Sequence, residues 1–121
     1  MALVCAALLV APETIAAGPI YGVQSCSTPR VQPTRIVFAC VDAGALIHNV
    51  HWRHWGGRIA VGSGTYWEVE ACRCRARSFR ATVWLGDVGA CPGHGSRQFY
   101  RRAKVAGVRS LFPGLCPISD P

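Results

Sequence analysis

The chain has 121 residues, 50% of them apolar, and its formal net charge is +7 at pH 7. A chain of this length forms one small domain and is too short for several. Seven cysteines are many for a cytosolic protein, so the composition favours an oxidising, extracellular environment.

Residues 1–17 predict a signal peptide. Residues 2–11 form an uninterrupted apolar run that is too short to cross a bilayer and typical of a signal-peptide core. Small residues follow and offer cleavage after Ala16, Ala17 or Gly18. No Lys or Arg precedes the run, which leaves open a start upstream of Met1, and a buried N-terminal helix is the alternative. We expect a secreted or cell-envelope protein whose mature chain has no membrane span.

The rest of the chain predicts strands between two irregular ends. Residues 18–33, rich in Gly and Pro, predict an irregular arm, and residues 109–121 predict an irregular tail. A β domain over residues 34–108 is expected between them, with strands at 34–41, 45–55, 58–72 (as one strand or two), 77–86 and 97–108. No segment resembles a βαβ unit, which argues against a nucleotide-binding α/β fold. We therefore predict an all-β fold, a small antiparallel β-sandwich or open barrel held by disulfides.

The stretch "HNVHWRHWGG" (48–57) raises the question of a metal site. Strict alternation along a strand places His48 and His54 on one face, about 20 Å apart, and His51 on the other. One metal ion, with ligands at about 2 Å, does not reach all three, so a metal site would need a further ligand such as His94. We expect neither a metal nor another cofactor, and interpret the stretch as a half-buried strand whose Trp and Val fill the core while His and Arg face water.

Removal of the signal peptide takes Cys5 away and leaves six cysteines, which predict up to three disulfides. Cysteines two apart on one strand point the same way, so Cys72 and Cys74 are expected to bond different partners. Cys40, in the apolar run "IVFACV", is expected to pair with Cys72 or Cys74. The remaining member of that close pair would then reach Cys91 or the outer Cys26 or Cys116. The disulfide candidates are Cys26, Cys40, Cys72, Cys74, Cys91 and Cys116.

Basic residues concentrate in the second half of the chain. Between positions 73 and 104 there are eight basic residues and one acid, Asp87. Such a surface suits a polyanion, either a nucleic acid or another anionic surface. The alternative is a solvated strand face whose arginines reflect a GC-rich genome. The candidates for polyanion binding are Arg73, Arg75, Arg77, Arg101, Arg102 and Lys104.

Catalytic patterns are sparse. A Ser-His-Asp set can be assembled on paper from Ser63, His94 and Asp42, but no Gly-x-Ser-x-Gly elbow accompanies it. We predict no catalytic residue and keep a small secreted enzyme as a further alternative.

Several short motifs are similar to those of small secreted proteins of unknown function from actinobacteria. In such proteins an "I-x-x-A-C-x-D" strand is followed by "W-x-x-W-G", then by an "A-x-G-x-G" turn and a cysteine pair. The matching segments are "IVFACVDAG" (36–44), "IHNVHWRHWG" (47–56), "AVGSGTY" (60–66) and Cys72, with "ATVWL" (81–85) and Tyr100 where later strands would come. The resemblance implies an exported, disulfide-bearing β domain and no particular activity. The chain departs from it in its tight "CRCR" spacing, its extra arginines and its tail with Cys116.

The expectation from the sequence is thus a secreted, non-enzymatic domain that acts in the envelope or on an extracellular protein. A cationic protein that binds polyanions is the first alternative.

Overall fold

The computed structural model describes residues 18–40, 44–70, 72 and 74–118, and its regular secondary structure is entirely β. The predicted signal peptide, residues 1–17, lies outside the described residues. The seven strands are β1 (Ile20–Val23), β2 (Pro29–Arg30), β3 (Arg35–Val37), β4 (Ala45–His54), β5 (Ala60–Val69), β6 (Ala76–Gly89) and β7 (Gln98–Val105).

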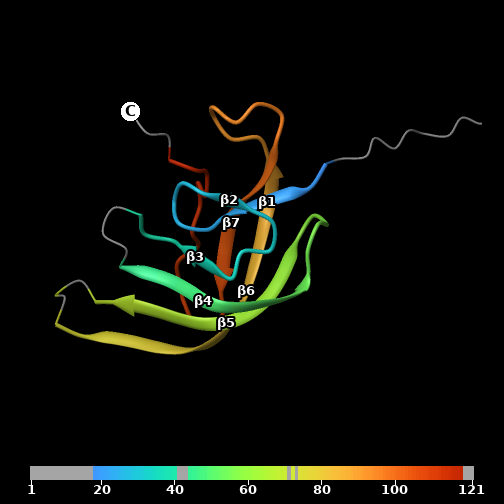
Figure 1. The fold of residues 1–121 in the computed structure, drawn as a ribbon. Helices are drawn as coiled ribbons and strands as arrows, with labels where there is room; N and C mark the ends of the chain where they lie inside the picture. The colour runs from blue at the N-terminus through green and yellow to red at the C-terminus, as the bar shows by residue number, and fades with distance from the viewer. Residues whose placement is uncertain (1–17, 41–43, 71, 73, 119–121) are drawn as a thin grey trace, which may run out of the picture.

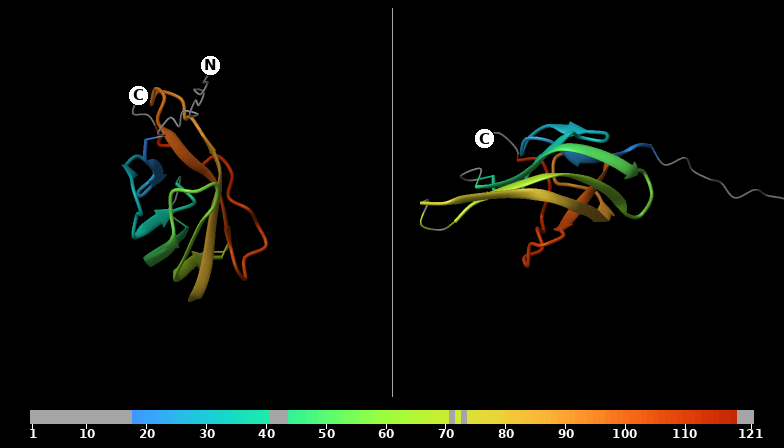
Figure 2. Two further views of the ribbon diagram at one scale, coloured as in Figure 1. Left: turned by 90° about the vertical axis from the view of Figure 1, so that its right-hand side faces the viewer. Right: turned by 90° about the horizontal axis from the view of Figure 1, so that it is seen from below.

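All seven strands belong to one sheet with the order β2-β1-β7-β6-β5-β4-β3. Neighbouring strands are antiparallel except β1 and β7, which run parallel. The sheet curls, because β6 bends along its length and carries β7 and β1 out of the plane of β4 and β5 (Figures 1 and 2). The all-β prediction is confirmed, and the structure is the open barrel of the two predicted architectures, in the form of a half-barrel.

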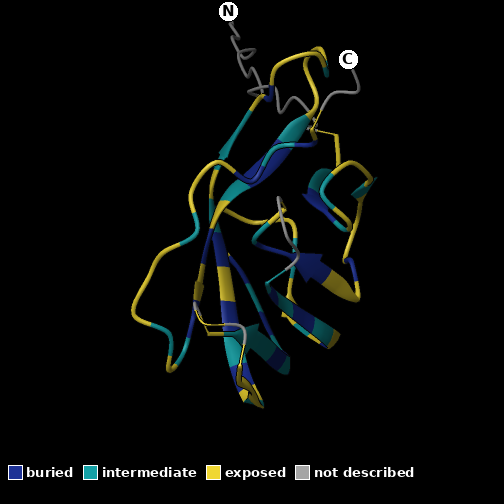
Figure 3. Cartoon of the chain, turned by 90° about the vertical axis from the view of Figure 1, so that its left-hand side faces the viewer, coloured by how far each residue is buried: buried dark blue, intermediate teal, exposed yellow. Residues whose placement is uncertain are grey.

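The core lies on the concave side of this curl (Figure 3). Alternation along β6 explains how it forms, since Ala81, Val83 and Leu85 are buried while the residues between them are not. A second, smaller cluster joins Val23 and Phe99 to the Cys91 disulfide.

The segment 18–33 is better ordered than predicted, because it supplies β1 and β2. Two tryptophans attach it to the sheet. Trp52 donates its indole N–H to the carbonyl of Pro33 at 2.8 Å, and Trp55 donates to the carbonyl of Ile20 at 3.0 Å. These hydrogen bonds join residues far apart in the sequence, and no local pattern indicates them. The prediction of an irregular arm depended only on the turn-forming Gly and Pro residues of the segment. The described tail, 109–118, has no strand and makes one bridge, between Phe112 and Ala103.

The six cysteines within the described residues form three disulfides, Cys26–Cys40, Cys72–Cys74 and Cys91–Cys116. The predicted pairing of Cys40 with Cys72 or Cys74 is wrong. Strand β3 ends at Val37, so Cys40 lies in an exposed loop, where it meets Cys26 of the N-terminal arm. Strand β3 is also an edge strand, and β4 separates it from β5.

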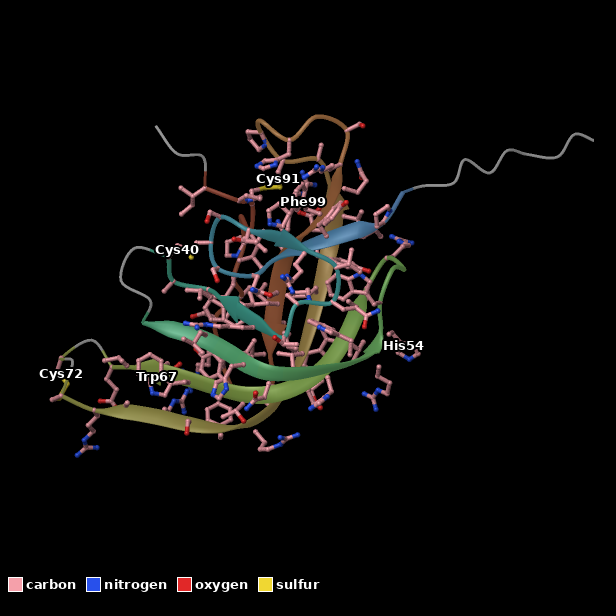
Figure 4. All side chains as sticks on the ribbon, viewed as in Figure 1. Cys40, His54, Trp67, Cys72, Cys91 and Phe99 are labelled. Atoms are coloured by element: carbon pink, nitrogen blue, oxygen red, sulfur yellow. A yellow bond between two sulfur atoms is a disulfide. The ribbon has the colours of Figure 1, made fainter. Side chains whose placement is uncertain are left out.

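The expectation that Cys72 and Cys74 bond different partners is wrong for a related reason. Strand β5 ends at Val69 and β6 begins at Ala76, so both cysteines lie in the turn at the tip of a long hairpin (Figure 4). Strand alternation does not apply to a turn. The two Cα atoms are 5.2 Å apart, within the range that a disulfide spans.

Candidate binding surface

Two bulges in β4 place all three histidines of the "HNVHWRHWGG" stretch on one face of the sheet. The register with β5 shifts between His48 and His51 and again between Trp52 and His54. As a result, the three histidines lie opposite Thr65, Ser63 and Val61, which are alternate residues of β5 and share one face. The prediction that His51 points away from the other two is therefore wrong.

The first bulge depends on Asn49 and Gly64. Asn49 has a φ of 53°, in the left-handed region that asparagine adopts more readily than most residues. Across from it, a Cβ on Gly64 would lie 2.6 Å from the carbonyl oxygen of His48, so only glycine allows the strands to approach this closely. Asparagine is depleted in strands, and its presence inside a predicted strand is the signal by which the bulge could have been found.

The prediction that the Trp and Val residues of this strand fill the core while its His residues face water is confirmed. Val50 is buried, and Trp52 packs edge-on against Trp55, which in turn packs against Tyr100. His51 and His54 are exposed.

The histidines belong to a larger surface that continues across β6 and β7. The register aligns His48 with Thr65 and Arg80, His51 with Ser63 and Thr82, and His54 with Val61, Trp84 and Lys104. One step further along, Arg102 lies opposite Gly86. We call this surface the outer face and define it by His48, His51, His54, Val61, Ser63, Thr65, Arg80, Thr82, Trp84, Gly86, Arg102 and Lys104. It carries the cations Arg80, Arg102 and Lys104 and, within the described residues, no Asp or Glu.

Two hollows mark the outer face. A shallow depression of about 380 Å³ lies over β4, β5 and β6, with His51, Arg53, Ser63 and Thr82 among the residues that line it. Its floor is low because glycine, serine and threonine stand where larger side chains would fill it.

The second hollow, of about 200 Å³, is apolar. Ile59, Trp84 and Leu111 line it and remain 57%, 37% and 57% exposed, which makes them three of the most exposed large apolar residues described. Arg102 and Lys104 also line it. The hollow therefore offers apolar contact directly beside positive charge.

The structure divides the predicted polyanion-binding residues between two places. Lys104 and Arg102 lie on the outer face, and Arg102 also approaches Asp87 at 3.9 Å. Arg101 turns toward Asp87, whose carboxylate it contacts at 3.0 Å. Asp87 thus offsets part of this charge.

Of the other predicted cations, Arg73 lies outside the described residues, and Arg75 and Arg77 lie toward the tip of the β5–β6 hairpin. Arg75 is exposed there. Arg77 bonds the Glu68 carboxylate at 2.8 Å and lies over the ring of Phe79. Sequence reasoning missed Arg80 as a member of a binding surface, because the register that aligns it with His48 is a tertiary property.

The carboxyl of Glu68 is held ionised by its neighbours. Tyr66 donates its hydroxyl to one oxygen at 2.7 Å and Arg77 donates to the other. The Tyr66 hydrogen bond, followed by the Arg77 guanidinium, lowers the pKa of Glu68 below its ordinary value, while partial burial opposes the shift. Burial and the Glu68 carboxylate raise the pKa of the Tyr66 hydroxyl.

Of the Ser-His-Asp set that can be assembled from the sequence, the two described residues lie on separate elements. Ser63 is in the middle of β5, whereas His94 lies in the β6–β7 loop against the ring of Phe99. Asp42 is outside the described residues. The described part of the chain contains no cluster of three or more His, Cys, Asp or Glu side chains placed to hold a metal ion. It also contains no helix with the length and apolar character needed to cross a bilayer.

Fold and surface together define a small disulfide-bonded half-barrel with a cationic, histidine-rich outer face. No protein-family model matches the chain, and neither the curated proteins nor the solved structures contain a significant match.

Proposed function

We propose that this protein is an exported, non-enzymatic domain that binds an extracellular polyanion through its outer face. The observation that carries the proposal is the alignment of three histidines, two arginines and a lysine on one face, beside which Asp87 approaches Arg102 at 3.9 Å. Export is supported by the predicted signal peptide, the three disulfides and the resemblance to secreted actinobacterial proteins.

The chemistry of the face suits sulfate, phosphate or carboxylate groups repeated along a polymer. Arginine and lysine attract such groups electrostatically, and arginine bonds them in a fork. Neutral imidazole adds one N–H donor per ring. The histidines recur at alternate positions opposite β5, so neighbouring ones are about 7 Å apart along the strand. A flexible polymer with closely spaced charges can contact several of them at once.

The apolar hollow lined by Ile59, Trp84 and Leu111 adds a second kind of contact for a polyanion. Trp84 stands beside Lys104, so a sugar ring or a nucleobase could pack on the indole while its anionic group meets the lysine. Polymers with ring-shaped repeating units therefore fit the surface better than inorganic polyphosphate does.

Heparin affinity chromatography of the full chain provides the test, with the salt concentration at elution as the measurement. The variant Arg80→Gln/Lys104→Gln removes two charges from the outer face. The variant Arg30→Gln/Arg97→Gln removes two charges from the β1–β2 end of the sheet and serves as the matched control. We expect the outer-face variant to elute at clearly lower salt than the control, because each lost anion contact weakens binding and its salt dependence. Equal elution of the two variants would contradict the proposal, as would failure of the wild-type chain to bind above 50 mM salt.

A further inference from the structure

The Cys72–Cys74 disulfide differs from the other two in what it connects. Cys26–Cys40 ties the N-terminal arm to the end of β3, and Cys91–Cys116 ties the β6–β7 loop to the tail. These two bonds join residues 14 and 25 positions apart, whereas Cys72 and Cys74 are two positions apart. A bond that closes so short a loop removes little freedom from the unfolded chain.

The hairpin that carries this pair also closes without it. The β5–β6 ladder runs to the pair Val69 and Ala76, and beyond it the backbone N–H of Glu70 donates to the carbonyl of Arg75 at 3.0 Å. The disulfide lies outside this last hydrogen bond, at the extreme tip of the hairpin (Figure 4). Its contribution to the fold is therefore small.

Both sulfur-bearing residues are exposed, in contrast to Cys91, which is 4% exposed and packs against Val23 and Phe99. Thiol–disulfide exchange requires an attacking sulfur to approach along the S–S axis, so exposure is the first requirement for reactivity. The tip of a hairpin with both cysteines exposed is accessible to a large partner protein.

The surroundings favour one of the two sulfurs as a thiolate. The backbone N–H of Cys74 donates to Sγ of Cys72 at 3.2 Å. When the bond is reduced, the same N–H is positioned to stabilise negative charge on Cys72. Arg75 follows directly in the chain, is exposed, and adds positive charge near the pair. Nearby cations and N–H donors are what make cysteines reactive in proteins.

We propose that Cys72–Cys74 is a redox-active disulfide that exchanges with a dithiol of a partner protein, and that Cys72 is the sulfur that forms the mixed disulfide. This activity is separate from polyanion binding, because the hairpin tip lies outside the outer face.

The exchange balances as a two-electron transfer. A thiolate of the partner attacks Sγ of Cys72, the Cys72–Cys74 bond breaks, and Cys74 leaves as a thiolate that takes up a proton. The partner's second thiolate then attacks the partner's own sulfur in the mixed disulfide, and Cys72 leaves as the thiolate stabilised by the Cys74 N–H. The partner dithiol is oxidised to a disulfide, and the cysteine pair is reduced to a dithiol. In the reverse direction the reduced pair reduces a partner disulfide.

The first test uses the oxidised full chain in glutathione buffers of graded redox potential, with alkylation by N-ethylmaleimide and peptide mapping. We expect Cys72 and Cys74 to be alkylated under conditions in which the other two disulfides remain intact. Simultaneous reduction of all three bonds, or reduction of Cys72–Cys74 last, would overturn the proposal.

The second test separates the roles of the two sulfurs. Cys74→Ser keeps the backbone N–H at position 74 and leaves Cys72 as a single thiol, whereas Cys72→Ser leaves only Cys74. With oxidised glutathione at pH 7, we expect Cys74→Ser to form a mixed disulfide about tenfold faster than Cys72→Ser, because a charge-assisted hydrogen bond favours the Cys72 thiolate. Adding Arg75→Gln to Cys74→Ser should slow its reaction, and adding Arg97→Gln should not. Equal rates for the two single-cysteine variants would show that the pair has no assigned attacking sulfur and would refute the mechanism. Thermal unfolding should show both variants folded like the wild type, since the bond holds little of the structure.

Discussion

Replacing Gly64 with alanine tests the origin of the outer face. The added Cβ would lie 2.6 Å from the carbonyl oxygen of His48, and 3.1 Å and 3.2 Å from the side chains of Val50 and Ile47. A backbone oxygen at the bulge cannot rotate away as a side chain can, so β4 has to move. Overpacking of this kind costs about 1–3 kcal/mol, and the loss of glycine's freedom in the unfolded chain returns about 0.4–1 kcal/mol. We therefore expect a net loss of about 1–2 kcal/mol, which lowers Tm by roughly 5–15 °C in a domain of this size.

Circular dichroism with the disulfides intact measures this shift, and Gly57→Ala is the matched control. A Cβ at position 57 would meet only the carbonyl oxygen of Ile59, at 3.9 Å, and Gly57 does not have a positive φ. The control should stay within about 0.5 kcal/mol of the wild type. If Gly64→Ala and Gly57→Ala unfold at the same temperature, the close approach of β5 to the bulge does not hold the strands as described.

Three further outcomes follow from the described contacts. Asn49→Gly should keep the bulge and leave urea stability nearly unchanged, whereas Asn49→Val should lose about 1–2 kcal/mol, because a β-branched residue resists a φ of 53°; equal midpoints would speak against the left-handed conformation. Cys91→Ser/Cys116→Ser should lose about 3.5 kcal/mol of unfolding free energy, because the disulfide closes a loop of about 26 residues, and Cys72→Ser/Cys74→Ser should lose far less. Thermal unfolding measures both losses, and a larger loss in the second variant would contradict this ranking of the two disulfides. Because the pKa of Glu68 is lowered in the folded state, the unfolded chain takes up a proton at Glu68 more readily, so Glu68 stabilises the fold above its ordinary pKa of 4.5 and that stability is lost as the pH falls. Between pH 7 and pH 3.5, urea unfolding should show a smaller loss of unfolding free energy for Glu68→Gln than for the wild type. Equal losses would contradict the pairing of Glu68 with Tyr66 and Arg77.

The fold class could be predicted because each long strand carries its own signal. In β6, the alternation of the small and aliphatic Ala81, Val83 and Leu85 with other residues indicates which face of the strand is buried. The predicted strand at 45–55 matches β4 except for one residue at its end. The prediction succeeded there because Gly56 and Gly57 indicate where the strand ends.

The candidate site could not be predicted to the same extent, because it depends on register. Asn49 changes the phase of the alternation at the first bulge, so His51 faces the opposite side from the one predicted, and the second bulge returns His54 to the predicted side. The prediction of the disulfide partners was wrong because it also depended on where the strands end. The apolar run predicts a buried strand through Cys40, whereas β3 ends three residues earlier and Cys40 bonds Cys26 of the N-terminal arm.

The lengths of the outermost strands bear on how this protein survives at high concentration. The first and last strands in the sheet order are β2, with two residues, and β3, with three, whereas the strands of eight to fourteen residues each have a neighbouring strand on both sides for part of their length. An exposed edge invites another molecule to add a strand, which is a route to aggregation, and short edges offer such a molecule few hydrogen bonds. Pro29 also lacks an N–H to donate, and Arg30 and Arg35 place positive charge on both borders. Two copies of the chain that meet at β2 or β3 therefore repel each other and find little backbone to pair with.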